Sequence, residues 1–285
     1  MSEPHPFDAD TAVSRTAAGE FDATVSERWS LLAGHANGGY ALGLCVRALQ
    51  AEAAYPDPVV VTAHYLRRVL PGPARLIVDP IRVGRRLWVG EVRLMQDGKE
   101  KVRASAAFAD LATASGRTEL RNSAPDLPPP EQCLALSDEH RPPGLTLADR
   151  VEYRYRTLPG WRTGTPNGRL DYEFWMRFAP GPDGRIRDAD TLALPALVDM
   201  ATPPVLDLGE LSSTTIELSV HVRGVPAPGW LACRSSTRHV IDGYHEEDFE
   251  AWDSTGRLVA QARQLALLPN ESRSPFQQRD ARVAG

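Results

Sequence analysis

The chain has 285 residues, of which 42% are hydrophobic and 24% are charged, the composition of a folded globular protein and not of a fibrous or disordered chain. Its 32 Lys and Arg residues against 37 Asp and Glu residues give a net charge of −5, so no large basic field is present to attract a nucleic acid. The three cysteines, Cys45, Cys133 and Cys233, form no C-x-x-C pair, which argues against a disulfide framework or a cysteine zinc site.

Residues 1–19 are polar and acidic, unlike a secretory leader, and no run of 18 apolar residues occurs in the sequence. We therefore expect a cytoplasmic protein that binds neither nucleic acid nor membrane. The 24 prolines and 22 glycines imply many turns and short elements. This composition favours a β-rich architecture over a helical bundle.

The first half predicts a strand, one helix and an antiparallel meander. After a flexible N-terminus over 1–20, residues 21–29 are typical of a strand, and Asn37-Gly38-Gly39-Tyr40 precedes an apolar helical run over 41–51. Asp97-Gly98 is a strong hairpin signal between alternating apolar runs. The strands predicted after the helix are 59–66, 74–83, 88–95 and 101–108.

The second half predicts the same order of elements after a proline-rich connector over 112–165. It contains a strand at 171–178, a helix at 192–201 and then the strands 215–222, 230–235, 246–252 and 258–268. Pro71-Gly72-Pro73 aligns with Pro226-Ala227-Pro228 at an offset of 155, and Gly98 aligns with Gly256 at an offset of 158.

We interpret the chain as two copies of one α+β unit. The predicted organisation is a flexible segment 1–20, a unit over 21–111, a connector over 112–165, a second unit over 166–268 and a disordered tail over 269–285. Edge-to-edge pairing of the two units into one continuous sheet would remove two exposed strand edges.

Several common catalytic motifs are absent from the sequence. There is no G-x-S-x-G turn, no Walker phosphate loop and no G-x-G-x-x-G turn. His245-Glu246 begins like a zinc-protease helix, but Phe249 stands where the second histidine belongs. We therefore expect neither a metal nor another cofactor.

The order of short motifs over 21–268 resembles the TesB-like acyl-CoA thioesterases, a double-hotdog family. The resemblance implies two antiparallel sheets, each wrapped around a central helix and joined into one continuous sheet. The motifs that carry it are Asn37-Gly38-Gly39-Tyr40, His64-Tyr65-Leu66-Arg67-Arg68, Pro71-Gly72-Pro73, Gly84-Arg85, Gln96-Asp97-Gly98, the run 196–204, the run 215–221 and Gly256-Arg257-Leu258-Val259-Ala260.

The resemblance also implies a catalytic Asp, Thr and Gln from the second unit, and Asp199, Thr215 and Gln264 occupy those places. A buried Asp199 would act as general base on a water molecule, because burial raises a carboxyl pKa toward neutrality. Thr215 and Gln264 would position that water. Backbone amides of Asn37, Gly38, Gly39 and Tyr40 would bind the substrate and stabilise the developing oxyanion if the first helix reaches the site.

The internal repeat supports a single site in the second unit. By the offsets above, Asp199, Thr215 and Gln264 fall opposite Leu44, Val60 and Ala106. A buried polar group without a hydrogen-bond partner costs about 1–3 kcal/mol. Three polar residues in the second unit at positions that are apolar in the first therefore indicate one functional site. The alternative for each residue alone is ordinary: a helix aspartate, a strand threonine and a solvent-facing glutamine.

The implied function is hydrolysis of an acyl-CoA or acyl-carrier thioester to a thiol and a carboxylic acid. Two alternatives stay open: a hotdog enoyl-CoA hydratase or dehydratase, for which His35 is the one supporting residue, and a non-catalytic acyl-thioester binder. Tyr40, Trp88 and Trp230 either line an acyl tunnel or are plain core. A homodimer or higher homo-oligomer is expected, because hotdog sheets present a long edge and a helix-free face.

Overall fold

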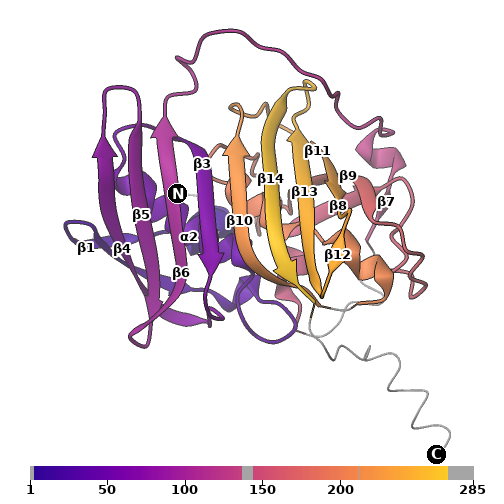
Figure 1. The fold of residues 1–285 in the computed structure, drawn as a ribbon, viewed down its shortest axis with the longest axis horizontal. Coiled ribbons are helices and arrows are strands. Elements are labelled where there is room, and N and C mark those ends of the chain that lie inside the picture. The colour runs from indigo at the N-terminus through magenta and orange to yellow at the C-terminus, as the bar shows by residue number, and fades with distance from the viewer. Residues whose placement is uncertain (1–2, 137–143, 211, 269–285) are drawn as a thin grey trace, which may run out of the picture.

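The computed structural model describes residues 3–136, 144–210 and 212–268, which form one antiparallel sheet of 14 strands (Figure 1). From its first edge to its centre the sheet runs β1 (Ser14–Ala17), β2 (Glu20–Val25), β4 (Gly72–Val83), β5 (Trp88–Gln96), β6 (Lys99–Ala109) and β3 (Asp57–Tyr65). It continues with β10 (Thr214–Val222), β14 (Leu258–Leu267), β13 (Tyr244–Trp252), β11 (Leu231–Ser236), β9 (Asp171–Phe178), β8 (Val151–Tyr155) and β7 (Leu134–Ala135), while β12 (Val240–Ile241) pairs with β13.

The two halves repeat one order of strands, counted outward from the centre of the sheet. Strands β3 and β10 meet at the centre in antiparallel register, with Val61 opposite Val220 and His64 opposite Glu217. Outward from this junction, β6, β5, β4 and β2 in the first half correspond to β14, β13, β11 and β9 in the second. The predicted fold class, an α+β double hotdog with one continuous sheet, is confirmed.

Two helices pack against the sheet, α2 (Gly38–Glu52) and α3 (Leu194–Met200). Asn37 caps α2, because its side-chain Oδ1 accepts the Tyr40 backbone N–H at 3.1 Å. The helix is buried along most of its length, as its nearly continuous apolar sequence requires. Helix α3 is shorter, because Ala201 is extended and Pro203 and Pro204 follow.

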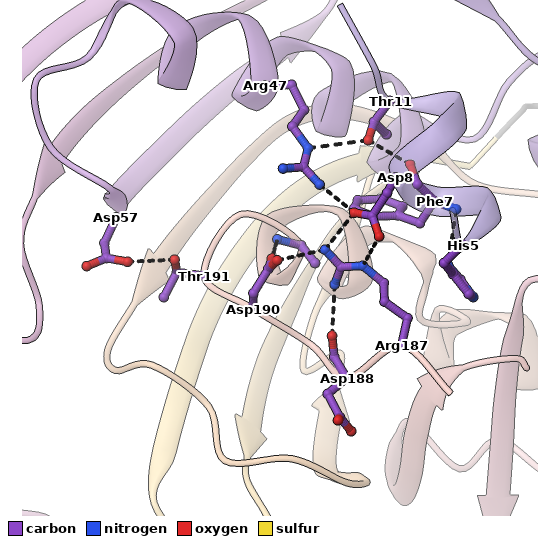
Figure 2. A network of polar contacts seen from close by, with 11 residues as sticks. His5, Phe7, Asp8, Thr11, Arg47, Asp57, Arg187, Asp188, Asp190 and Thr191 are labelled. Carbon is purple, nitrogen blue, oxygen red and sulfur yellow. Dashed lines mark hydrogen bonds and ion pairs between the residues drawn. The ribbon is translucent and has the colours of Figure 1, made fainter. Parts of the chain in front are cut away.

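The N-terminal segment differs from the expected flexible stretch over 1–20, since it forms α1 (Pro6–Asp10) and β1. Phe7 is fully buried between Trp29 and Phe178. Asp8 accepts hydrogen bonds from Arg47 of α2 and, twice at 3.0 Å, from Arg187 (Figure 2). The burial of Phe7, the charge network of Asp8, the hydrogen bonds that Asp10 accepts from Trp29 and Tyr40, and the pairing of β1 with β2 hold the segment. Periodicity over so few residues does not reveal these contacts.

The region over 112–165 is also more ordered than a connector. Strand β8 pairs with β9, so the second unit of the sheet begins before residue 166. Short 3-10 helices lie at Glu27–Trp29, Pro130–Gln132, Thr146–Asp149 and Pro204–Leu208. The tail over 269–285, expected to be disordered, lies outside the described residues. No helix in the described ranges is long and apolar enough to span a membrane.

Candidate active site

Asp199 lies in the last turn of α3 and faces the beginning of α2. Its carboxylate accepts the backbone N–H of Gly39, and Asn37 Nδ2 donates to the Asp199 backbone oxygen at 3.4 Å. A Cβ atom on Gly39 would lie 2.3 Å from the Ala196 backbone oxygen and 3.0 Å from the Asp199 Cβ atom. Only glycine permits this close approach, so the sequence at 37–39 brings the first half of the chain to Asp199.

The surroundings of the Asp199 carboxyl raise its pKa. Burial raises its pKa to about 7, and the nearby Glu247 carboxyl acts in the same direction, while the hydrogen bond from Gly39 opposes the rise. A group with this pKa is ionised in a large fraction of molecules near neutral pH and is a strong enough base to accept a proton from water.

Thr215 and Gln264 are in direct contact. Thr215 Oγ1 donates to Gln264 Oε1 at 2.8 Å, and Gln264 Nε2 donates to Glu247 Oε2 at 2.6 Å. Ser235 Oγ donates to the other carboxylate oxygen of Glu247, also at 2.6 Å. These four side chains form one hydrogen-bonded chain that crosses β10, β14, β13 and β11.

A small cavity lies between this chain and Asp199. It is lined by Val198, Asp199, Leu218, Glu247, Phe249, Ala262 and Gln264, and its volume for the centre of a water molecule is ≈ 10 Å³. That volume is close to the minimum that holds a single water molecule, and three of the lining residues carry polar groups that could bind one. The structure therefore brings Asp199 and Gln264 to one water-sized space, with Thr215 connected through Gln264.

Glu247 is a site residue that the sequence reasoning missed. It lies on the inward face of β13 together with His245, Phe249 and Ala251, where its exposed fraction is 4%. The signal was present, since the alternation over 244–252 places one acidic residue on the apolar face. Burial raises the pKa of Glu247 to about 7, and the hydrogen bonds from Ser235 and Gln264 oppose that rise.

Tyr65, at the end of β3, is a second missed residue. The position of a Cβ atom on Gly38 would be 2.8 Å from Asp199 Oδ2 and 3.0 to 3.1 Å from two ring atoms of Tyr65, so phenol and carboxylate meet across Gly38. The Tyr65 hydroxyl is buried and has no hydrogen-bond partner. Burial and the charge of Asp199 hold its pKa well above the usual value, so the hydroxyl keeps its proton and is a free donor.

The remaining predicted residues are placed differently. Asn37, Gly38 and Gly39 adjoin Asp199, whereas the Tyr40 ring stacks on Trp29 at 5.3 Å and its hydroxyl donates to the Asp10 backbone oxygen at 2.8 Å. The Tyr40 backbone N–H is already bonded to Asn37. The backbone N–H of Asn37 donates to the Trp29 oxygen at 2.8 Å, and that of Gly39 to Asp199. Substrate binding by the backbone amides of 37–40 thus stays a prediction, and it rests on Gly38.

Trp88, Trp230 and His35 are not among the residues that line the cavity. Trp88 is buried edge-to-face against Phe108, and Trp230 carries the Arg177 guanidinium 4.1 Å above its ring. Within residues 3–136, 144–210 and 212–268, no hydrogen bond or ion pair joins His35 to Asp199. The described part of the chain also contains no cluster of three or more His, Cys, Asp or Glu side chains arranged to hold a metal.

The register of the sheet corrects one of the equivalences inferred from the repeat. Leu218 faces Gln264 and Val61 faces Ala106, which supports the match of Gln264 with Ala106. Both β10 and β3 carry an irregularity at the same place, between residues 215 and 217 and between 58 and 60. Thr215 and Pro58 are each the last paired residue before the irregularity. Thr215 therefore corresponds to Pro58 and not to Val60.

Comparisons with known proteins identify the family of the chain. Residues 130–268 match the family model of the acyl-CoA thioesterase C-terminal domain, and residues 25–109 match that of the N-terminal domain. An uncharacterised protein of Mycobacterium tuberculosis is 28% identical over 291 residues, which cover 93% of this chain and 95% of the relative.

Two crystal structures show the same fold. A Thermobifida fusca protein, provisionally assigned as a thioesterase II, has a TM-score of 0.84 and 28% identity, covering 93% of this chain and 99% of its own. The acyl-CoA thioesterase II TesB2 of Mycobacterium marinum has a TM-score of 0.69 and 18% identity, covering 93% and 99%. At that lower identity the likeness concerns the fold alone.

Proposed function

The chain belongs to the acyl-CoA thioesterase family, and from that membership we propose that it hydrolyses an acyl thioester with Asp199 as the general base. The observation that carries the proposal is the cavity of ≈ 10 Å³ between Asp199, Glu247 and Gln264. It offers one water molecule a carboxylate whose pKa is about 7 and a side-chain amide. No nucleophilic serine or cysteine is required.

In the proposed reaction, Asp199 takes a proton from the water as the water oxygen attacks the carbonyl carbon of the thioester. A tetrahedral intermediate forms with negative charge on the former carbonyl oxygen. The carbon–sulfur bond then breaks, the carboxylic acid is released, and the proton from Asp199 passes to the thiolate sulfur. Gln264 holds the attacking water in place, and Thr215 holds the amide of Gln264.

The developing oxyanion requires donors that are in place before the reaction. In the first turn of α2 the backbone N–H groups of Gly39 and Tyr40 are bonded to Asp199 and Asn37, so the Gly38 N–H, at the positive end of the helix dipole, is the proposed backbone donor. The Tyr65 hydroxyl is an additional donor, since it is protonated, buried and unpartnered beside Asp199. Both contributions come from the first half of the chain, so the site is completed across the junction of the two units.

The proposed substrates are acyl thioesters of coenzyme A, with thioesters of a carrier protein as the nearest alternative. Thiol release from acyl-CoAs ranging from acetyl to palmitoyl tests this function, with wild type compared with Asp199→Asn. Asp171→Asn is a matched control, because Asp171 is an exposed residue of β9. We expect turnover of at least one acyl-CoA, a loss of about 1,000-fold or more in Asp199→Asn, and a change below about twofold in the control.

Turnover that Asp199→Asn leaves intact would refute the assignment of the base. Absence of turnover with every acyl-CoA, combined with hydration of an enoyl-CoA, would refute the hydrolase and favour the hydratase. Binding of acyl-CoA without either reaction would favour a non-catalytic binder.

A further inference from the structure

Glu247 is a buried carboxylate beside the cavity, and the proposed reaction assigns it no role. Its two oxygens both accept hydrogen bonds from neutral side chains, Ser235 and Gln264. No cation is paired with it among the ion pairs of residues 3–136, 144–210 and 212–268. A buried, uncompensated carboxylate is costly, so its presence at this point calls for a role.

The equivalent position in the first unit is a glycine. Glu247 faces Gln264 in the β13–β14 hairpin, and Gly90 faces Ala106 in the β5–β6 hairpin. The fold therefore forms without a side chain at this position. Glu247 and Gln264 occur together in the second unit, and their counterparts are absent together in the first.

The chemistry of an ionised carboxylate determines how the amide of Gln264 is oriented. A carboxylate only accepts hydrogen bonds, so it selects the NH₂ end of the amide and turns the carbonyl end toward Thr215. Thr215 then donates its single hydroxyl proton to Gln264 Oε1, as the distance of 2.8 Å shows. In this orientation the second N–H of Gln264 Nε2 is available to a water molecule in the adjoining cavity.

We infer that Glu247 is a positioning residue of the reaction, which fixes the amide of Gln264 so that an N–H group, and not a carbonyl oxygen, faces the attacking water. This inference rests on the proposed thioester hydrolysis. A water that accepts this N–H bond and donates to Asp199 keeps a second lone pair for attack on the thioester carbonyl. Inversion of the amide would offer the water an acceptor, which misdirects its lone pairs.

The ionisation of Glu247 sets the condition under which this orientation holds. Burial raises the pKa of Glu247 to about 7, and the charge of Asp248 on the same strand acts in the same direction. The other titratable groups that sense its charge are Asp199 on α3 and Tyr155 on β8. Assays at pH 8.5 therefore keep both Glu247 and Asp199 ionised.

The test is Glu247→Gln, which keeps the shape of the side chain and allows the amide of Gln264 to invert. We expect kcat to fall about 30-fold or more, with KM changed less than about threefold, because the loss concerns water orientation and not binding. Glu250→Gln is the matched control, since Glu250 lies on the same strand but faces outward, toward Arg234. A decrease of kcat below about threefold in Glu247→Gln, or a change confined to KM, would overturn the proposal.

A double-mutant cycle with Thr215→Val separates positioning from a structural role. Glu247 and Thr215 restrain opposite ends of one amide, so loss of either restraint already frees it. The double variant should lose little more activity than the more impaired single variant. Losses that multiply fully would show that the two residues act independently and would contradict the proposal.

An activity-independent measurement keeps the orientation testable if no acyl-CoA is turned over or if a variant is too weak to assay. The side-chain amide signals of Gln264 are identified in ¹H–¹⁵N spectra as those lost in Gln264→Met. One amide proton should be shifted downfield by its bond to the carboxylate and should return upfield in Glu247→Gln. Unchanged signals would refute the orientation, whereas shifted signals without turnover would leave the orientation established and the thioesterase proposal wrong.

Discussion

The hairpins β5–β6 and β13–β14 have the same pairing but contrasting interiors. In the first, Gly90 faces Ala106, and the ring of Trp88 lies where a Cβ atom on Gly90 would be, with atoms at 2.1 to 2.9 Å. In the second, Glu247 faces Gln264 beside a cavity of ≈ 10 Å³. Where one unit folds an indole over the equivalent position, the other places two polar side chains and leaves room for water.

This difference shows how one fold yields a scaffold half and a reactive half. Both units keep the bulge in the strand next to the junction, after Pro58 and after Thr215. The bulge thus belongs to the fold, and only the residue beside it changes from apolar to polar. The first half still contributes to the site, through the glycines at the start of α2 and through Tyr65. The following variants test this division from the largest expected effect to the smallest.

Replacing Gln264 by alanine gives the second hairpin the first hairpin's residue at this register position. We expect kcat to fall by about 100- to 1,000-fold, the usual cost of losing one positioned hydrogen-bond donor. Gln261→Ala on the same strand is the control, because the Gln261 side chain makes a long contact of 3.5 Å with Glu250 and does not line the cavity. Equal kcat values for the two variants, measured by thiol release, would show that Gln264 does not distinguish the second hairpin as the reactive one.

Gly39→Ala tests the contact between the two helices, and therefore between the two halves. Its Cβ atom would lie 2.3 Å from the Ala196 backbone oxygen, so α2 and α3 must separate at a cost of about 1–3 kcal/mol in the free energy of unfolding. Gly43→Ala on the same helix meets Thr11 at 3.3 Å, and the gain in helix propensity offsets that contact. The free energies of unfolding of both variants are measured by urea denaturation. Equal values would contradict the close approach of α2 and α3 at Gly39.

Tyr65→Phe tests whether the scaffold half supplies a donor to the reaction. We expect kcat to fall about tenfold, which corresponds to roughly 1.4 kcal/mol, with the free energy of unfolding unchanged or increased. The stability part follows because the Tyr65 hydroxyl is buried without a partner. A variant with full activity and lower stability would mean that the hydroxyl has a structural partner and no part in the reaction.

Arg187→Ala tests how α1 is tied to the second half. The Arg187 side chain is 11% exposed and pairs with Asp8 and Asp190 (Figure 2). Its guanidinium also lies over the rings of Phe7 and Phe178. Because both carboxylates are partly exposed, we expect a loss of only about 1 kcal/mol in unfolding free energy. Arg185→Ala, which removes an exposed ion pair with Asp183, is the control. Identical melting temperatures for the two variants would show that the contacts of Arg187 with Asp8 and Asp190 do not stabilise the protein.

Much of the architecture could be predicted from the sequence, because alternation and turn residues mark its strands. The apolar run after Asn37 placed α2, and Asp97-Gly98 placed the hairpin between β5 and β6. The fold of α1 could not be predicted, since it depends on one phenylalanine packing between residues distant in sequence. Glu247 lies within the predicted strand 246–252 and shares its inward alternation with Phe249 and Ala251, but its hydrogen bonds from Ser235 and Gln264 join residues of other strands, which no local pattern shows. The unpartnered state of the Tyr65 hydroxyl is a property of packing that no local pattern encodes.

The pH dependence of kcat/KM in wild type and Asp199→Asn tests the central claim most directly. Burial raises the pKa of Asp199 to about 7, and the base must be ionised to accept a proton. Burial also raises the pKa of Glu247 to about 7, and its protonation would release the amide of Gln264. The account therefore predicts that wild-type kcat/KM falls as the pH is lowered through about 7 with contributions from both carboxyls, and that the residual activity of Asp199→Asn falls less steeply, because Glu247 alone still titrates. Acid limbs with the same midpoint and the same slope in both proteins would show that another group is the base, and that the site is not the one described.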